Sequence, residues 1–531
     1  MSRQVTERFV ITGKLVAETP VHAGGIDGNP ATDMPLSVNG LGEVYVPGTS
    51  LAGPMRHWLI DAFDEERVQT FWGRIAKRNP PGEKGHASFV TIADAKVTLP
   101  GKSSTEVRDG VGIDRIYGAA ANGIKFDREV LPIGTTITFD MIFETDKDQR
   151  GKGEIRALLE ALVCGDIRLG AAKTRGLGKV MLDKAFSVKR FDLKSPSGIL
   201  DMLEGKFGTG GTNNGLDLLG GSKPTARPRI SIAIAWKPRG PVMVKASADG
   251  IGVDMMPLIT NSGNGSLAAV IPGASSKGAL RSQSERILAT VLGSSLAANT
   301  PFIDQLSRLP LIETMYGAVK KKVAVKQSQS GRGALSIDDC LAKVQLTEAE
   351  WTGIADKWRD EPGNTAIPTA VRQTLGVGMH VAIDRWTGGA ADGALFAAAE
   401  PEFAWNPINI EIDVGRLVPG DKECAARIPY FKHAALALLL LTLRDMVDGL
   451  VPLGFGVNRG YGDIKIETLT ISITNMDADL KIAAIDKLQI RKVGQDRATF
   501  NDPAKIGALD AAWQAYWQAP AAAPPEVVEQ A

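Results

Sequence analysis

The apolar and polar positions of this chain follow one pattern twice. In the first half, residues 8–17 alternate between apolar and polar as a strand does, and residues 51–63 have the periodicity of an amphipathic helix. A second alternating stretch at 135–143, a second helical stretch at 155–163 and a short strand at 178–182 follow. The pattern predicts the order β-α-β-β-α-β.

The second half repeats this order with a helix at 280–291, a strand at 408–414, a helix at 434–447 and a strand at 463–473. Such an order is typical of the ferredoxin-like or RNA-recognition-motif fold, in which two helices back one antiparallel sheet. The predicted fold class is therefore α+β, with two ferredoxin-like domains in tandem.

Four sequence blocks recur in the same order and support this duplication. The first two blocks of the first half are TPVHAGGIDGNPATDMPLS and VYVPGTSLAGPMR, and the second half has GPVMVKASADGIGVDMMPLI and AVIPGASSKGALR in their places. The third block is VGIDRIYGAAANG in the first half and VAIDRWTGGAADG in the second, and the Gly-rich fourth block is IRLGAAKTRGLGKV in the first and PLGFGVNRGYGDIKI in the second. Asp33 lies eleven positions after His22, and Asp254 lies eleven after Met243. An ordered set of this kind indicates two homologous domains in one chain.

The domain boundaries follow from the blocks. We expect a first domain at 1–200, a Gly-rich linker at 201–229, a second domain at 230–500 and a Pro/Ala-rich tail at 501–531. Two aligned arginines are 59 positions apart in the first copy and 104 apart in the second, so the second domain carries about 45 extra residues. We expect these between residues 292 and 372.

Composition narrows the class of protein. The chain has 531 residues, with 61 Lys and Arg against 60 Asp and Glu, so a basic face must be balanced by acidic surface elsewhere. Three widely spaced cysteines give no disulfide framework, and no apolar run has the length of a signal or a membrane span. These features favour a cytoplasmic protein. The 58 glycines indicate tight turns or close backbone approach.

The quoted blocks resemble those of the RAMP superfamily, and most closely the backbone subunits that line the guide RNA in type III CRISPR interference complexes. The resemblance covers both halves, so the chain looks like two such subunits fused. It implies binding of CRISPR guide RNA, target RNA and other type III subunits, with no membrane partner. It also implies a Gly-rich loop and a thumb-like hairpin in each domain.

The resemblance further implies a loop aspartate in each domain that cuts target RNA, and Asp33 and Asp254 match that position. One carboxylate can hold a divalent cation or help to deprotonate a 2′-hydroxyl, so we expect Mg²⁺ or Mn²⁺ at both. Asp27 and Asp249 are the nearest alternatives, and both candidates could instead be ordinary turn residues. His22 could serve as a base, but it has no counterpart in the second copy.

The expected RNA-binding residues are cationic or lie at helix starts, where free N–H groups favour an anion. They are Ser50, Arg56, Arg115, Lys173 and Arg175 in the first copy, and Ser275, Lys277, Arg281, Arg385 and Arg459 in the second. The alternatives are capping serines and surface charges on plain turns. Ile116 and Trp386 are the expected thumb residues, which either stack on bases or pack beneath their hairpins.

Three functions are consistent with these features. The favoured one is a guide-binding, metal-dependent endoribonuclease subunit that cuts target RNA at one site per domain. The second is a scaffold that binds guide RNA and leaves cleavage to a partner. A guide-processing enzyme of the same superfamily is a remoter third.

Overall fold

The structure, a computed structural model, describes most of the chain. The described residues are 4–25, 32–75, 85–205, 215–221, 223–225, 227–246, 252–263, 265–318, 331–357, 369–420, 423–475, 479–492 and 496–519. The alternative aspartates Asp27 and Asp249 lie outside them. The chain divides into two compact units. Unit 1 comprises residues 1–108, 126–226 and 261–265, and unit 2 comprises 109–125, 227–260 and 266–531.

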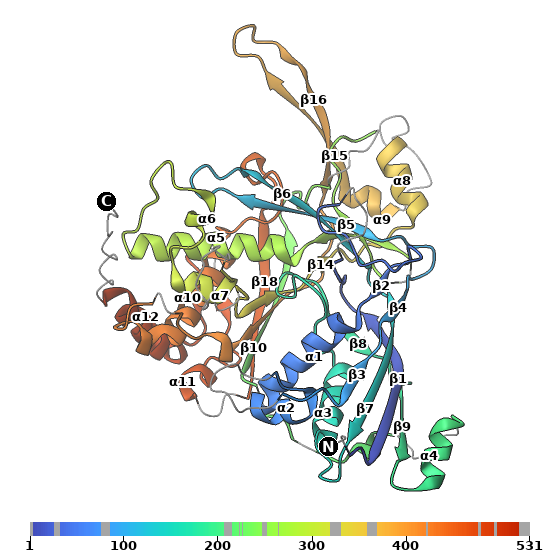
Figure 1. Ribbon diagram of the computed structural model, residues 1–531. Helices are drawn as coiled ribbons and strands as arrows, with labels where there is room; N and C mark the ends of the chain where they lie inside the picture. Colours follow the sequence, from blue (N-terminus) through green and yellow to red (C-terminus); the bar gives the residue numbers. More distant parts are fainter. Residues whose placement is uncertain are drawn as a thin grey trace, which may run out of the picture. The chain divides into compact units, whose positions relative to one another are not determined.

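Unit 1 is built around one antiparallel sheet (Figure 1). Its strands are β1 (Glu7–Ala17), β2 (Tyr45–Val46), β3 (Val90–Ile92), β4 (Ala95–Thr98), β7 (Thr136–Thr145), β8 (Val180–Leu182) and β9 (Ser187–Asp192). Its helices are α1 (Gly48–Phe63), α2 (Glu65–Trp72), α3 (Lys152–Val163) and α4 (Pro196–Leu203). The strands and helices predicted for the first half are confirmed, with boundaries shifted by a few residues.

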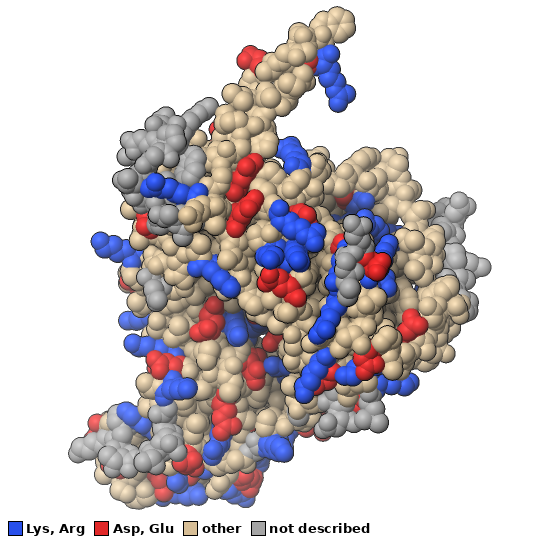
Figure 2. All heavy atoms as spheres, turned by 180° about the vertical axis from the view of Figure 1, so that it is seen from behind, with Lys and Arg blue, Asp and Glu red and all other residues tan. Residues whose placement is uncertain are grey.

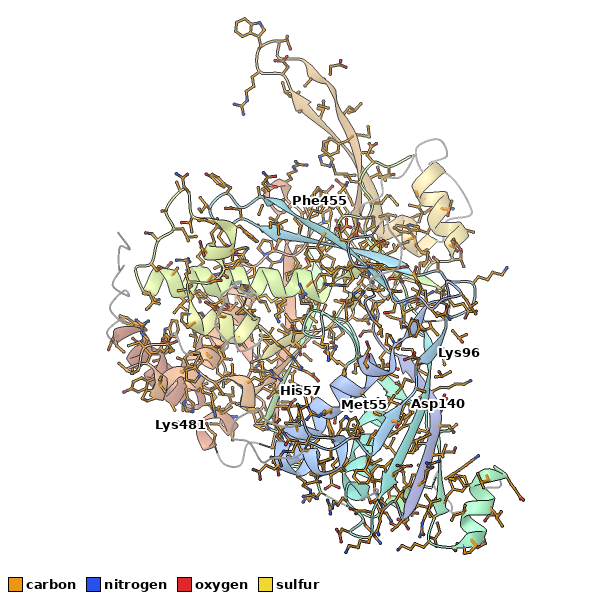
Figure 3. The ribbon with its side chains drawn as sticks, viewed as in Figure 1. Met55, His57, Lys96, Asp140, Phe455 and Lys481 are labelled. Carbon is orange, nitrogen blue, oxygen red and sulfur yellow. The ribbon has the colours of Figure 1, made fainter. Side chains whose placement is uncertain are left out.

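The central strand β1 pairs with β7 on one side and with β8 and β9 on the other. Side chains alternate across the sheet, so Phe9, Ile11 and Leu15 are buried under α1 and α3. Lys96 on β4 and Asp140 on β7 point to the opposite, solvent-exposed face (Figure 3). One apolar and one polar face is what the alternation in the sequence predicts.

Unit 2 has the corresponding order of elements. Its strands are β10 (Arg229–Pro238), β12 (Leu267–Ile271), β13 (Leu335–Ile337), β14 (Cys340–Leu341), β15 (Leu375–Ile383), β16 (Ala390–Pro401), β17 (Ile408–Asp413), β18 (Ile464–Thr474), β19 (Ile490–Arg491) and β20 (Thr499–Phe500). Its helices are α5 (Gly273–Val291), α6 (Phe302–Gln305), α7 (Pro310–Tyr316), α8 (Glu348–Lys357), α9 (Thr369–Thr374), α10 (Phe431–Val447), α11 (Leu480–Ala483) and α12 (Gly507–Gln518). Strand β11 (Ile259–Asn261) reaches the boundary between the units.

The main sheet of unit 2 has the order β13-β17-β10-β18, in which β10 takes the central place that β1 has in unit 1. Helix α10 is rich in apolar residues and most of its residues are buried, in packing against α5, α7 and α12. Among the described helices, none has the length and apolar character needed to cross a bilayer.

Part of the extra sequence of the second half lies between α5 and α7. In unit 1, Asp64 alone separates α1 from α2. In unit 2, residues 292–309 separate α5 from α7 and include the short helix α6. Unit 1 has no counterpart of α6 at this place among its described residues.

The predicted C-terminal tail is wrong for residues 507–518. They form α12, which buries Leu509, Trp513 and Tyr516 against α10. Apolar residues at helical spacing carry this packing, and the Pro- and Ala-rich composition of the last residues concealed it. The predicted linker also differs, because Leu219 within it is buried in the core of unit 1.

Two long β-hairpins correspond to the expected thumbs. Strands β5 (Glu106–Ile113) and β6 (Ala120–Val130) form the first, and β15 and β16 form the second. The tip of the first hairpin, residues 109–125, belongs to unit 2. The second hairpin extends away from the sheet of unit 2 (Figure 1), and charged side chains are sparse along its length (Figure 2).

Candidate nucleic-acid interface

The Gly-rich loop of unit 1 lies directly against the chain that follows β1. The N–H of Ala171 donates to the carbonyl of His22 at 3.0 Å, and the N–H of Gly178 donates to that of Pro20 at 2.8 Å. A Cβ on Gly170 would lie 2.0 Å from the His22 oxygen, and Gly170 has a φ of +70°. Only glycine fits this position, so the loop is held at the end of the strand.

Unit 2 has the same arrangement. The N–H of Phe455 donates to the carbonyl of Met243 at 2.7 Å, and Gly462 donates to Pro241 at 2.8 Å. A Cβ on Gly454 would lie 2.1 Å from the Met243 oxygen. The structural equivalence of the two Gly-rich loops agrees with the sequence repeat.

The loop that carries Asp33 is tied to strand β6. The N–H of Asp33 donates to Asp127 Oδ1 at 2.7 Å, and the N–H of Asp127 donates to Asp33 Oδ2 at 3.0 Å. The two carboxylates therefore lie side by side, and Asp33 is exposed. Sequence reasoning missed Asp127, because the second copy does not repeat it.

Asp254 has the matching position in unit 2. Its Oδ2 accepts from the N–H of Ala397 at 2.6 Å, and Met255 bridges to Ala398 as Met34 bridges to Arg128. Ala397 thus takes the place of Asp127. Among the described residues, unit 2 presents one carboxylate here where unit 1 presents two.

The predicted Arg175 lies near a second arginine, Arg128, which the sequence analysis did not single out. The pKa of Arg128 is lowered to about 10. Burial is the larger cause, and the positive charge of Arg175 contributes to the same lowering. The Nε of Arg128 has no hydrogen-bond partner among the described atoms. Arg175 keeps an exposed side chain, although desolvation by its surroundings lowers its pKa as well. Neighbouring guanidinium groups of this kind favour an anion between them.

His22 is a buried, neutral imidazole. Burial lowers its pKa most, the carbonyl of Glu129 opposes that shift, and the charge of Arg128 lowers the pKa further. Its Nδ1 lies 2.7 Å from the Glu129 carbonyl, so Nδ1 is the donor and Nε2 can accept a proton.

Unit 1 has a cavity of about 430 Å³ beside His22 and the Gly-rich loop. The lining includes His22, Gly24, Ser50, His57, Gly170 and Lys173. Three predicted features therefore meet here: the strand end, the start of α1 and the Gly-rich loop. His57 and Met55 come from α1, where Met55 is buried in the core and His57 is exposed (Figure 3). Arg56 is half-buried on the same helix and does not line the cavity.

Two predicted RNA-binding residues of unit 2 are structural instead. Lys277 is 5% exposed, and its Nζ donates to the Leu335 carbonyl at 2.7 Å. Arg281 pairs with Glu285 and donates to the carbonyls of Gly317 and Leu306. The two cations hold α5 to neighbouring segments, because the faces of α5 that carry them turn into the core. Ser275 stays half-buried near the start of α5.

The remaining predicted cations lie on the loop and the hairpins. Arg459 is exposed, and its guanidinium lies 5.8 Å from the centre of the Phe396 ring. Arg385 is exposed at the tip of the second hairpin, whereas Arg115 is bound to Glu285. Of the predicted thumb residues, Ile116 is half-buried and Trp386 is 96% exposed.

One comparison with known proteins bears on this geometry. Residues 14–180 match the family model of the RAMP superfamily. The first unit of this chain therefore contains a RAMP domain, which implies a ferredoxin-like fold and a CRISPR-associated protein that binds CRISPR RNA. The match covers less than half of the chain, so the second half is linked to it by the internal repeat. No curated protein matches the chain.

No group of three or more His, Cys, Asp or Glu side chains capable of holding a metal ion occurs in the described part of the chain. The RAMP domain offers the pair Asp33 and Asp127 instead. Mg²⁺ is often held by one or two carboxylates together with substrate phosphates, so this pair fits such an ion. The single carboxylate of Asp254 meets the lower limit of the same range.

The lowered pKa of His22 predicts a pH dependence of stability. The unfolded chain binds a proton near pH 6.5 and the folded RAMP domain binds it only at lower pH, so stability falls as pH drops through that window. His22→Met, which introduces the residue of the second copy, should remove this component. Urea unfolding at pH 7.5 and pH 5 measures it, with exposed His86→Asn as the control. Equal pH dependence of wild type and His22→Met would contradict the assignment.

Proposed function

We propose that this chain is a guide-RNA-binding backbone subunit of a type III CRISPR effector, with two RAMP domains of ferredoxin-like fold, each cutting target RNA at one site. The observation that supports it most is the repeated geometry in the two units: a Gly-rich loop fixed to a strand end, and a loop aspartate fixed to the second strand of a hairpin. The match to the RAMP superfamily supports the first domain directly.

The guide backbone would run along the Gly-rich loops. Backbone N–H groups and the exposed Arg175 and Arg459 can contact phosphate there without bulky side chains in the way. In the RAMP domain, Lys173 adds a cation that lines the cavity, and Arg128 adds a buried positive charge next to Arg175. Unit 2 has Ala398 in place of Arg128, so we expect the first unit to hold phosphate more tightly.

Cleavage would follow the in-line chemistry of RNA. The 2′-oxygen attacks the adjacent phosphorus, the bond from phosphorus to the 5′-oxygen breaks, and the products are a cyclic phosphate and a 5′-hydroxyl. Asp33 and Asp254 would accept the 2′-proton directly or through water, and His22 Nε2 could do so in unit 1. Mg²⁺ or Mn²⁺ at these carboxylates would offset the charge that develops on the phosphate.

The hairpin arms supply the thumbs of this proposal. Their outward faces expose Val111 and Ile113 on β5, and Val381 and Ile383 on β15. Such apolar faces can lie against unstacked bases and interrupt the duplex of guide and target. Trp386 extends the second face, whereas Ile116 is too enclosed to add much to the first.

One observation favours the scaffold alternative. The aspartates accept hydrogen bonds from the hairpin backbone, Asp33 at Asp127 and Asp254 at Ala397, which is also what structural turn residues do. If these bonds were their whole role, cleavage would belong to a partner subunit.

Replacing the aspartates separates the two functions. In the assembled complex, Asp33→Ala should lose one cut of a guide-complementary RNA and keep the other, and Asp254→Ala should do the reverse. Each loss should reach about 100-fold or more, because each carboxylate takes part in the transition state. Gel analysis of the products checks this, with exposed Asp140→Ala as the control. If both variants keep every product, the scaffold function is correct.

The carboxylates also predict a metal requirement. One or two carboxylates cannot neutralise the charge on the reacting phosphate, so cleavage should stop in EDTA and return with Mg²⁺ or Mn²⁺. Bound RNA should remain, since the guide is held by arginines and backbone amides. Full cleavage in EDTA would contradict the metal requirement and would indicate His22 as the base.

The Gly-rich loops predict a salt dependence. Arg175→Ala combined with Arg459→Ala should weaken guide binding at every sequence and reduce the log–log salt slope by up to roughly 0.7 per lost phosphate contact. Filter binding over a salt series measures this. Lys14→Ala with Lys465→Ala, two exposed cations on β1 and β18, is the control that should leave the slope unchanged. An unchanged slope in the arginine variant would place the guide elsewhere.

A further inference from the structure

The tips of the two hairpins have the same backbone turn. In the first, the N–H of Gly118 donates to the Asp114 carbonyl at 2.9 Å, and in the second, Gly388 donates to Asp384 at 2.8 Å. In both tips the aspartate Oδ1 accepts from the N–H two residues later, at 2.8 Å and 2.7 Å. Each tip therefore presents an Asp–Arg pair in the same local conformation.

The first tip is docked on α5 and α6 within unit 2. Arg115 Nε donates to Glu285 Oε2 at 2.6 Å, and its backbone N–H donates to Gln305 Oε1 at 2.8 Å. Gln305 Nε2 donates in turn to Asp114 Oδ2 at 2.9 Å. A carboxylate and a carboxamide thus satisfy the two charged groups of the tip, and Arg115 is only 16% exposed.

Strand β5, which leads into this tip, packs closely on the same surface. A Cβ on Gly112 would lie 2.5 Å from Cζ of Phe302, so the glycine lets the strand approach the α6 ring. The docked tip therefore has three recognition elements: Glu285, Gln305 and a flat apolar ring.

The second tip has no such partner in the described structure. Arg385 is exposed and makes no hydrogen bond or ion pair among the described residues, and the structure records no partner for Asp384 Oδ2. Trp386 beside them is almost fully exposed. A tip with the same chemistry is thus left without the acceptor that its counterpart uses.

A second copy of this chain does not supply that acceptor. In the aligned helices α1 and α5, Ile60 takes the place of Glu285, and unit 1 lacks the segment that carries Phe302 and Gln305. The acceptor of unit 2 is already occupied by the first tip. In addition, Ala382 stands where the docked hairpin has Gly112, so its Cβ would meet a ring at the Phe302 position.

We propose that the tip formed by Asp384, Arg385 and Trp386 docks on a different protein, whose helical surface presents a Glu or Asp carboxylate to Arg385 and a Gln or Asn carboxamide to Asp384. The contact would have the chemistry of the Arg115 contact with Glu285 and Gln305, without an aromatic ring beneath the arm. Copies of this chain would therefore not associate with one another through the second hairpin. The proposal is independent of RNA cleavage.

The chemistry of the tip favours protein over RNA as the partner of this contact. The carboxylate of Asp384 would be repelled by phosphates beside Arg385, whereas a carboxamide satisfies it by donating an N–H. In the docked first tip, the arginine is paired with the carboxylate of Glu285. The apolar arm remains available for bases.

The surface formed by Glu285, Gln305 and Phe302 can serve as the test partner, here called the acceptor, once the first hairpin tip that covers it is removed. The acceptor chain is the full-length protein with residues 114–118 replaced by Asn-Gly and with Arg385→Ala, so that it cannot donate. The donor chain is the full-length protein with Ala382→Gly, which removes the Cβ that would clash with the Phe302 ring of the acceptor. Sedimentation velocity should show a complex of these two chains and none for the wild type alone. Arg115→Glu offers a second acceptor, opened by repulsion from Glu285.

Charge-changing substitutions at Arg385 and Glu285 test whether these two side chains form the contact. Arg385→Ala in the donor should weaken association by at least about tenfold, because it removes a charge-assisted hydrogen bond to Glu285 Oε2 on a buried carboxylate. Glu285→Arg in the truncated acceptor should abolish association, and Arg385→Glu in the donor should restore it. Asp392→Asn on the same hairpin is the control that should change nothing. The proposal is overturned if both acceptors fail to bind, if binding ignores Arg385, if the wild type self-associates through this tip, or if Arg385→Ala instead weakens RNA binding.

Discussion

Close approach of a glycine to a backbone carbonyl is the constraint on which the candidate interface depends. At Gly170 and Gly454 there is no room for a Cβ against the carbonyls of His22 and Met243. The approach lets the loop donate N–H groups to the chain after β1 or β10, which fixes its cations beside the strand end. The buried strands below provide the rigid base that holds this geometry.

The two units keep this framework and differ in the groups placed on it. Unit 1 has His22, Asp127 and Arg128 around its loop, whereas unit 2 has Met243, Ala397 and Ala398. In its described part, the second site is thus less charged and has the Asp254 carboxylate without a counterpart of Asp127. Two sites with the same backbone can bind RNA alike and still differ in metal affinity and in the steps that limit cleavage.

The hairpins show how one local structure can take different roles. Their turns are closed by the same hydrogen bonds, so the local sequence determines their shape. Whether a tip is bound depends on a remote helix: Glu285 and Gln305 satisfy the first tip, and no described residue satisfies the second. Arg385, without a partner among the described residues and beside an exposed tryptophan, is the observation on which the proposed protein contact rests.

The sequence by itself determined the two-fold repeat, the Gly-rich loops, and several of the long helices and strands, because these depend on local periodicity and on glycines that tolerate positive φ. The short strands β2, β3 and β4 of unit 1 and the central strand β10 of unit 2 were not among the predicted elements. It also singled out Asp33 and Asp254, which stay predicted site residues. Only the tertiary structure decided which cations are accessible. Lys277 and Arg281 lie on α5, whose buried face cannot be identified from spacing alone where its residues are polar. Asp127 and Arg128 join the site through strand pairing with residues far away in sequence, and α12 is recognised as core because its apolar side chains meet α10.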